Sequence, residues 1–334
     1  MKRLNLEIKN PEPILRSLNG LFSEDGNPEQ QLLRLPAQQD YENPLRMEVL
    51  KNAIGMKQVL LPEILHAFGI RAITLDKSHD LKKLQEIAGS LDLTQREGAR
   101  DYFKDPELVT ELKALFRKSS TIAFDDWGSF PGGVSVWRDL FKEVIQPLHR
   151  FGVEFIFYLG NPAQKPSYQV GEILEIISEF TKVGEVTLAL DEMEALNLWR
   201  WLNGVDASVD LGPSTIVNLK KKYHSIFLTT DFSRLLVYSA NDAMLFSSND
   251  QFVLSRKLVE AKVEIGDNAR LNFISGYSAG LHLGVGIAQS IALGLIIFGA
   301  SGVYNTFPDR KAIEDYISAW IADLEKPETI NLYQ

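Results

Sequence analysis

The chain of 334 residues contains no cysteine and only five histidines. The absence of cysteine excludes disulfides, thiolate catalysis and cysteine-ligated zinc. The histidines have no spacing typical of a metal site; they are His66, His79, His149, His224 and His282. No Walker-type phosphate loop occurs. P-loop nucleotide-binding proteins are therefore excluded as a class.

The chain also has too little positive charge for a general polyanion-binding protein, since its formal net charge is -9. Binding to nucleic acid or to an anionic membrane needs a basic surface, so neither is expected. A local cationic pocket for a phosphorylated ligand stays compatible with this charge. Residues 1–7 lack the apolar segment of a secretory signal, which predicts a cytoplasmic location.

Residues 271–305 contain no Asp, Glu, Lys or Arg. Three interpretations compete for this stretch. About 20 apolar residues suffice to span a membrane, but the many glycine and serine residues make a poor single span. Gly284 and Gly286 favour a break between two short buried helices. Alternatively, Ser275-Gly276 forms the mouth of a helix that binds an anion.

Hydrophobic periodicity predicts alternating strands and helices along most of the chain. We predict strands at residues 4–8, 70–75, 121–124, 153–159, 186–190, 225–230, 235–238, 243–246 and 259–265. We predict helices at residues 11–21, 60–68, 135–149, 170–180, 191–202 and 311–324, and two helical stripes within 80–120. The strand–helix–strand spacing of residues 121–160 implies a parallel sheet with a right-handed crossover.

Polar residues follow two of these strands, where ligands of parallel sheets are found. This places Asp125, Asp126, Trp127, Asn161 and Lys165 near any site. Asp125 and Asp126 could also act as a carboxylate pair in acid–base or metal chemistry, although no third group accompanies them.

Residues 278–284 resemble the Asn-Ala-Gly-Phe-x-Leu-Gly segment of ribokinase/PfkB-type carbohydrate kinases. In that family a Gly-Ala-Gly-Asp motif precedes the segment at a helix N-terminus. Its glycine amides bind the transferred phosphate, and its Asp activates the sugar hydroxyl. An ungapped alignment places this motif on residues 272–275, so that Ser275 takes the position of the catalytic Asp. The resemblance implies that Ser275, Gly276 and Tyr277 lie at the nucleotide phosphates.

Two further segments resemble one bacterial branch of these kinases. Residues 126–133 are similar to its Asn-Trp-Ser-x-x-Pro-Gly turn, and residues 156–162 to its Phe-Phe-Asp-Leu-Ala-Asp-Pro segment. Tyr158 and Asn161 replace the two acids of the second segment. The substrate-side residues that this resemblance implies are Asp126, Trp127 and Asn161.

The segment after the strand at residues 186–190 resembles the family's Asn-x-x-Glu motif, whose Glu helps to position magnesium and phosphate. Glu194 matches that Glu, and Asp191 replaces the Asn. The resemblance therefore implies that Asp191 and Glu194 serve Mg and ATP, with Glu194 as the metal ligand. Acidic residues in the first turn of a helix also favour the helix dipole without any ligand, and this structural interpretation stays open.

The resemblance implies a ribokinase-like α/β fold with a central, mostly parallel sheet and helices on both faces. We expect a single domain over residues 1–334, in which residues 1–50 form an extension or a small lid. The expected partner is a sugar or nucleoside-like small molecule, and a homodimer is compatible with the resemblance.

Two functions remain open. One is phosphoryl transfer from ATP, with Mg, to a sugar or related alcohol. The other is a catalytically inactive relative that binds a ligand or a protein. A serine cannot accept a proton as an aspartate does, and loss of a general base lowers rates by about 10²–10⁴-fold. Asp126 or Asp267 could substitute as the base, but residues 266–268 precede the expected helix mouth at Ser275, which argues against Asp267.

Overall fold

The computed structural model describes thirteen segments of the chain, and within them the strands form one nine-stranded sheet. The segments are residues 4–8, 10–19, 31–35, 71–74, 103–104, 106–124, 133–158, 162–164, 166–206, 208–209, 216–256, 269–304 and 310–325. The strands are β1 (Leu4–Glu7), β2 (Gln31–Leu35), β3 (Arg71–Thr74), β4 (Ser119–Phe124), β5 (Val153–Tyr158), β6 (Gly184–Asp191), β7 (Arg234–Tyr238), β8 (Asp242–Ser247) and β9 (Asp250–Ser255). Their order is β1-β9-β8-β7-β6-β5-β4-β2-β3. Only β8 is antiparallel to its neighbours in this described sheet, so the predicted mostly parallel arrangement is confirmed.

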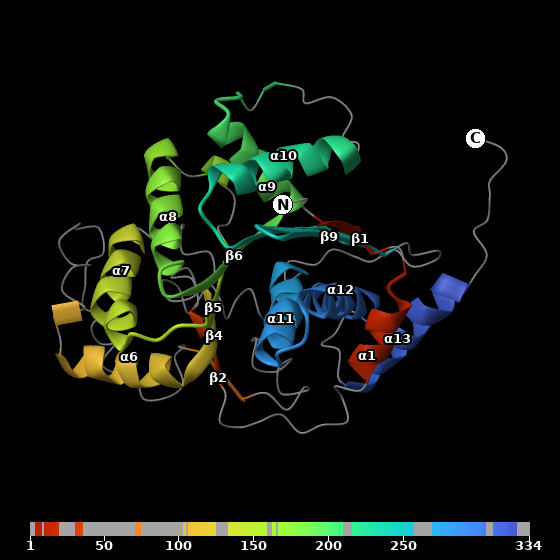
Figure 1. The fold of residues 1–334 in the computed structure, drawn as a ribbon, viewed down its shortest axis with the longest axis horizontal. Coiled ribbons are helices and arrows are strands. Elements are labelled where there is room, and N and C mark those ends of the chain that lie inside the picture. The colour runs from red at the N-terminus through yellow and green to blue at the C-terminus, as the bar shows by residue number, and fades with distance from the viewer. Residues whose placement is uncertain are drawn as a thin grey trace, which may run out of the picture.

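Helices cover both faces of the sheet (Figure 1). One layer holds α6 (Pro106–Lys118), α7 (Gly133–Asp139), α8 (Ser167–Phe180), α9 (Glu192–Leu202) and α10 (Ile216–Thr229). The other layer holds α1 (Glu12–Asn19), α11 (Ala269–His282), α12 (Ile287–Tyr304) and α13 (Arg310–Glu325). A π-helical segment (Leu140–Ile145) and a 3-10 turn (Gln146–Leu148) extend α7, in agreement with the helix predicted at residues 135–149.

The central strands are apolar along nearly their whole length because both of their faces are covered. Phe155 and Phe157 of β5 enter the core under α6–α10, whereas Ile156 between them enters the core under α1 and α11–α13. Phe157 stacks on Phe124 of β4 with ring centroids 4.4 Å apart. Side chains that alternate in this way join the two helical layers through the sheet.

The charge-free stretch forms the two packed helices α11 and α12, so the buried-pair interpretation is confirmed. Gly284 has a φ of 71° in the turn between them, a conformation that glycine adopts without strain. A Cβ on Gly276 would lie 2.5 Å from the Leu293 carbonyl oxygen, and one on Gly280 would lie 2.6 Å from the Ser290 Cα. The glycines therefore allow close contact between the helices. Within the described residues, no helix has the length and hydropathy needed to span a membrane.

The strand predicted at residues 225–230 is wrong, because α10 extends to Thr229. Leu219, Tyr223 and Ile226 enter the core at helical spacing, and Leu228 points to solvent. Strands β2 and β9 were not predicted. The predicted strand at 259–265, the predicted helix at 60–68 and the stripe at the start of 80–120 lie outside the described residues.

Candidate functional site

The carboxyl ends of β6 and β7 and the first half of α11 meet at one edge of the sheet. The ring of Phe273 in α11 stacks on that of Tyr238 at the end of β7, with centroids 4.2 Å apart and planes 4° apart. The other end of α11 lies at the opposite edge, where His282 Nδ1 is 3.1 Å from Ser120 Oγ near the start of β4. Helix α11 therefore runs against the strand direction, and its first turn lies at the carboxyl edge, where parallel sheets bind ligands.

Asp191 and Glu194 lie together at this edge, at the junction of β6 and α9. The Glu194 amide donates to Asp191 Oδ1 at 2.7 Å, and the Asp191 amide donates to Glu194 Oε2 at 3.0 Å. This reciprocal pair is a capping box that satisfies two amides at the start of the helix. Glu194 is buried, with only 2% of its surface exposed. The geometry thus supports the structural interpretation of these acids as a helix cap.

Further polar groups gather near the same junction. Burial raises the pKa of the Glu192 carboxyl, and the carboxylates of Asp242 and Asp191 raise it further. Burial, and then Glu192 and Asp191, also raise the pKa of the Tyr223 hydroxyl. That hydroxyl is buried and has no hydrogen-bond partner among the residues that the structure describes. The described part of this edge is therefore acidic and would repel the phosphates of a nucleotide.

These residues do not fit a magnesium site. In the part of the chain that the structure describes, no group of three or more His, Asp or Glu side chains could hold a metal ion. Glu194 already uses one carboxylate oxygen for the Asp191 amide. Magnesium prefers several oxygen ligands in near-octahedral geometry, which a single capped carboxylate does not provide.

Ser275, Gly276 and Tyr277 lie inside α11 and not at its mouth. The helix begins at Ala269, so the amides of these three residues bond within the helix and cannot form an anion hole. Ser275 is 1% exposed, Gly276 contacts the Leu293 backbone, and the Tyr277 hydroxyl is 3.3 Å from Thr187 Oγ1. The prediction that a helix begins at Ser275 is therefore wrong. Gly276 and Gly280 instead allow α11 to pack closely against α12.

Because α11 begins at Ala269 and not at Ser275, residues 266–268 directly precede the helix in sequence. Their distance from Ser275 is therefore no longer an argument against Asp267 as a base. They lie outside the described residues, as do the predicted substrate-side residues Asp126, Trp127 and Asn161 and their neighbours Asp125 and Lys165. The carboxyl ends of β4 and β5, which Asp126 and Asn161 follow in sequence, do lie at the same edge as Asp191.

Sequence reasoning missed Glu192, Tyr223 and Asp242 as members of this group. Their proximity depends on the packing of α10 against α9 and on the β7–β8 hairpin. The helical spacing of Leu219, Tyr223 and Ile226 is the signal that would have placed Tyr223 on an inward helix face.

No family model and no curated protein matches the sequence. Solved structures do match the fold. A probable sugar kinase from Rhizobium etli CFN 42 has a TM-score of 0.50 and 14% identity over 88% of this chain and 100% of its own. Adenosine kinase from Schistosoma mansoni has a TM-score of 0.48 and 12% identity over 89% of this chain and 79% of its own. The first match, with the nine-stranded order and the two helical layers, shows that this chain has a ribokinase-like α/β fold.

Proposed function

We propose that this protein binds a sugar or nucleoside-like small molecule at the carboxyl edge of its sheet and does not transfer phosphate to it. The observation that carries the proposal is the capping box of Asp191 and Glu194, which engages both acids that the resemblance assigns to Mg and ATP. The likeness to a probable sugar kinase supports the class of ligand. At 14% identity this likeness is one of fold, and the chemistry has to come from the residues themselves.

The described residues lack the parts that phosphoryl transfer needs. Such transfer relies on a base or positioning group, on donors for the phosphate oxygens and on a metal ion. Ser275 is neither a base nor accessible, and Asp191 and Glu194 bond to each other's backbone in the capping box. The acidic edge around Glu192 and Asp242 favours a neutral ligand over a nucleotide. On this proposal neither ATP nor Mg is a cofactor.

Asp126, Trp127 and Asn161 are the proposed ligand-binding residues. A carboxylate and an amide can bond to the hydroxyls of a sugar, and an indole ring can stack on its apolar face. Their places in sequence, directly after β4 and β5, support this assignment. A cytoplasmic location and a homodimer stay predictions.

The test has two measurements on the purified full chain. The first follows nucleotide consumption with Mg-ATP across a panel of sugars and nucleosides, and we expect none above background. The second measures binding of the same panel without nucleotide by isothermal titration calorimetry. We expect at least one ligand to bind, and Asp126→Asn to weaken it about ten-fold, since a hydrogen bond to a charged group contributes about 1.5–3 kcal/mol. Asp231→Asn is the control, because Asp231 is exposed at the opposite edge.

Turnover by the wild-type protein would overturn the non-catalytic part of the proposal. Asp126→Asn and Asp267→Asn would then show which carboxylate supplies the base. The absence of binding by every sugar and nucleoside would overturn the ligand class and favour a protein-interaction scaffold.

A further inference from the structure

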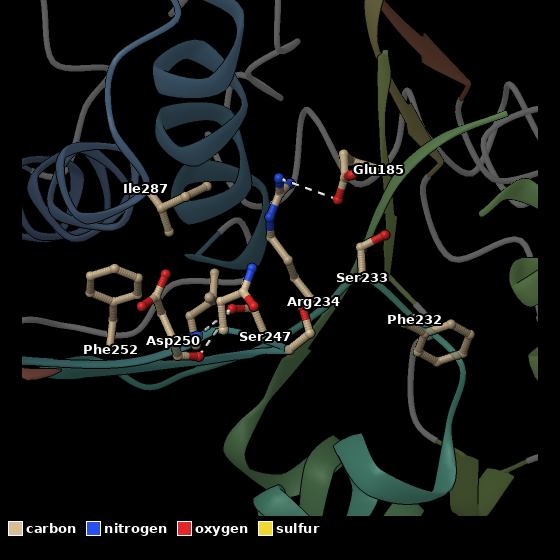
Figure 2. Close-up of a pocket in the computed structure, with 11 residues that line it drawn as sticks. Glu185, Phe232, Ser233, Arg234, Ser247, Asp250, Phe252 and Ile287 are labelled. Carbon is tan, nitrogen blue, oxygen red and sulfur yellow. Dashed lines mark hydrogen bonds and ion pairs between the residues drawn. The ribbon is translucent and has the colours of Figure 1, made fainter. Parts of the chain in front are cut away.

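Two arginine side chains at opposite edges of the sheet differ in their partners. Arg234, at the start of β7, lines a cavity of about 490 Å³ at the amino edge (Figure 2). Its Nη1 donates to Glu154 Oε2 at 2.6 Å, and its Nη2 lies 3.5 Å from Glu185 Oε2, the pair that Figure 2 marks. The charge of Arg234 is therefore neutralised within the protein, and an anionic ligand there would have to compete with two carboxylates.

Arg256 directly follows β9 at the carboxyl edge, and its side chain is buried without such partners. The residue is only 4% exposed. Its guanidinium lies 3.7 Å from the ring centroid of Tyr316 and 5.3 Å from that of Trp320, both on α13. Among the residues that the structure describes, Nε and Nη1 have no hydrogen-bond partner, and no carboxylate lies within ion-pair distance. Arg256 is therefore a buried charge without a counter-charge in contact.

This arrangement is unfavourable for the protein alone. The desolvation of an unpaired ion costs more than contacts with aromatic rings return. Burial lowers the pKa of the Arg256 guanidinium to about 10, and the carboxylate of Asp323 on α13 opposes this effect only in part. The guanidinium thus stays protonated at neutral pH, and a bound anion would offset its desolvation.

A second unpartnered donor lies beside this guanidinium. The Tyr316 hydroxyl is buried and, like Arg256 Nη1, has no hydrogen-bond partner in the described part of the chain. A Cβ on Gly299 of α12 would lie 2.6 Å from Arg256 Nη1 and 1.6 Å from the Tyr316 hydroxyl oxygen. Both donors therefore crowd the same point of the α12 backbone, where only glycine leaves them room.

The surroundings limit the kind of anion that fits these donors. Paired N–H groups and a hydroxyl match the oxygens of a carboxylate or a phosphate. A single guanidinium with Asp323 nearby, in a chain of formal net charge -9, favours one negative charge over the two of a phosphate. Tyr316 and Trp320 are 3% and 1% exposed, so they offer no open apolar surface for the body of a larger ligand.

We propose that Arg256 and the Tyr316 hydroxyl bind the carboxylate of a short monocarboxylic acid at the junction of β9, α12 and α13. The strands β8, β7 and β6 lie between β9 and β5, which separates this site by about 19 Å from the end of β5. The guanidinium also lies on the α12–α13 side of the sheet, whereas the acidic group around Glu192 lies at α9 and α10. The anion site is therefore independent of the proposed sugar site.

The experiment follows thermal unfolding of the full chain, dialysed free of carboxylates, in sodium formate or acetate and in sodium chloride of equal ionic strength. We expect each carboxylate to raise the melting temperature of the wild type by about 2 °C at ten times its Kd. Formamide and acetamide, which match the acids in size and lack the charge, should have no effect. Arg256→Met should abolish the response, and Tyr316→Phe should weaken carboxylate affinity about five-fold, the effect of one hydrogen bond.

Arg256→Met also gives a result that does not depend on the ligand. In chloride alone the wild type keeps an unpaired buried charge, whereas the variant has none and its thioether still packs on the aromatic rings. We expect the melting temperature of Arg256→Met to equal or exceed that of the wild type. Arg117→Met is the matched control, because Arg117 is exposed on α6, and it should keep the full response to formate.

Four outcomes would overturn the proposal. A lower melting temperature of Arg256→Met in chloride would show that the protein itself already pairs the guanidinium. An equal response of the wild type and Arg256→Met to formate would place the effect elsewhere. No stabilisation of the wild type by either carboxylate would remove the site, and stabilisation by phosphate at lower concentrations than by formate would replace the carboxylate with a phosphorylated ligand.

Discussion

Ser275 has almost no contact with solvent, so the substitution that restores a kinase-like Asp puts a carboxylate into the core. Burial of an unpaired carboxylate costs several kcal/mol. We expect Ser275→Asp to lower the free energy of unfolding in urea by about 3 kcal/mol or more. Ser275→Ala should change it by about 1 kcal/mol, the value of one hydrogen bond. A Ser275→Asp protein that is as stable as the wild type and consumes nucleotide would show that Ser275 faces an open site.

His282 is the buried histidine for which the structure gives a defined pH effect. Burial lowers its pKa, and its Nδ1 lies 3.1 Å from Ser120 Oγ. The unfolded chain binds a proton near pH 6.5, and the folded chain binds it only at lower pH. The stability that His282 contributes is thus full above about pH 6.5 and is lost as the pH falls toward its folded pKa.

We therefore expect wild-type stability in urea to fall between pH 7.5 and 5.5, and to fall less in His282→Gln. His149→Asn is the control, because His149 is exposed in a left-handed conformation that Asn tolerates. Equal pH slopes for the wild type and His282→Gln would contradict the assignment.

At the scale of elements, the contact between α11 and α12 depends on glycines that allow the two backbones to approach. A Cβ at Gly276 would lie 2.5 Å from the Leu293 carbonyl oxygen, which is backbone and cannot turn away. We expect Gly276→Ala to destabilise the protein by about 1–3 kcal/mol, the usual effect of overpacking. Gly171→Ala in α8 is a matched control, since its Cβ would meet Trp201 at an ordinary 3.6 Å. That control should stabilise by about 0.5–1 kcal/mol through helix propensity, and a loss as large as that of Gly276→Ala would contradict the packing argument.

Substitutions of Asp191, at the start of α9, can distinguish its role as a helix cap from a role in metal binding. Asn caps helices about as well as Asp, whereas Ala does not. We expect Asp191→Ala to lower the free energy of unfolding by about 1 kcal/mol and Asp191→Asn to change it by a few tenths. Ligand binding should be unchanged in Asp191→Asn. If Mg²⁺ raises the melting temperature of the wild type and not of Asp191→Asn, the carboxylate binds metal and the cap is not its only role.

Sequence alone predicted the elements whose hydrophobic pattern is compatible with only one kind of secondary structure. β5 and β6 are apolar on both faces, which only a covered parallel sheet accommodates, and Gly284 ends a charge-free helix. The segment 225–230 is rich in Ile, Phe and Thr, which have high strand propensity, and this led to the wrong prediction of a strand. The segment is helical because its apolar residues pack into the core at helical spacing. Ser275 was misplaced because an ungapped motif fixes an alignment but not the residue at which a helix begins.

At the scale of the whole molecule, β6 runs from the amino edge of the sheet at Gly184 to the carboxyl edge at Asp191, where the proposed ligand site lies. Glu185 at one end and Asp191 at the other are separated by about 20 Å along the strand. Charges at this distance are screened in physiological salt, where the Debye length is about 8 Å. We therefore expect Glu185→Gln to leave the affinity for the sugar or nucleoside ligand unchanged. Calorimetric titration of that ligand into the wild type and into Glu185→Gln checks this, and a change in affinity of more than about three-fold would reveal a coupling free energy carried through the sheet.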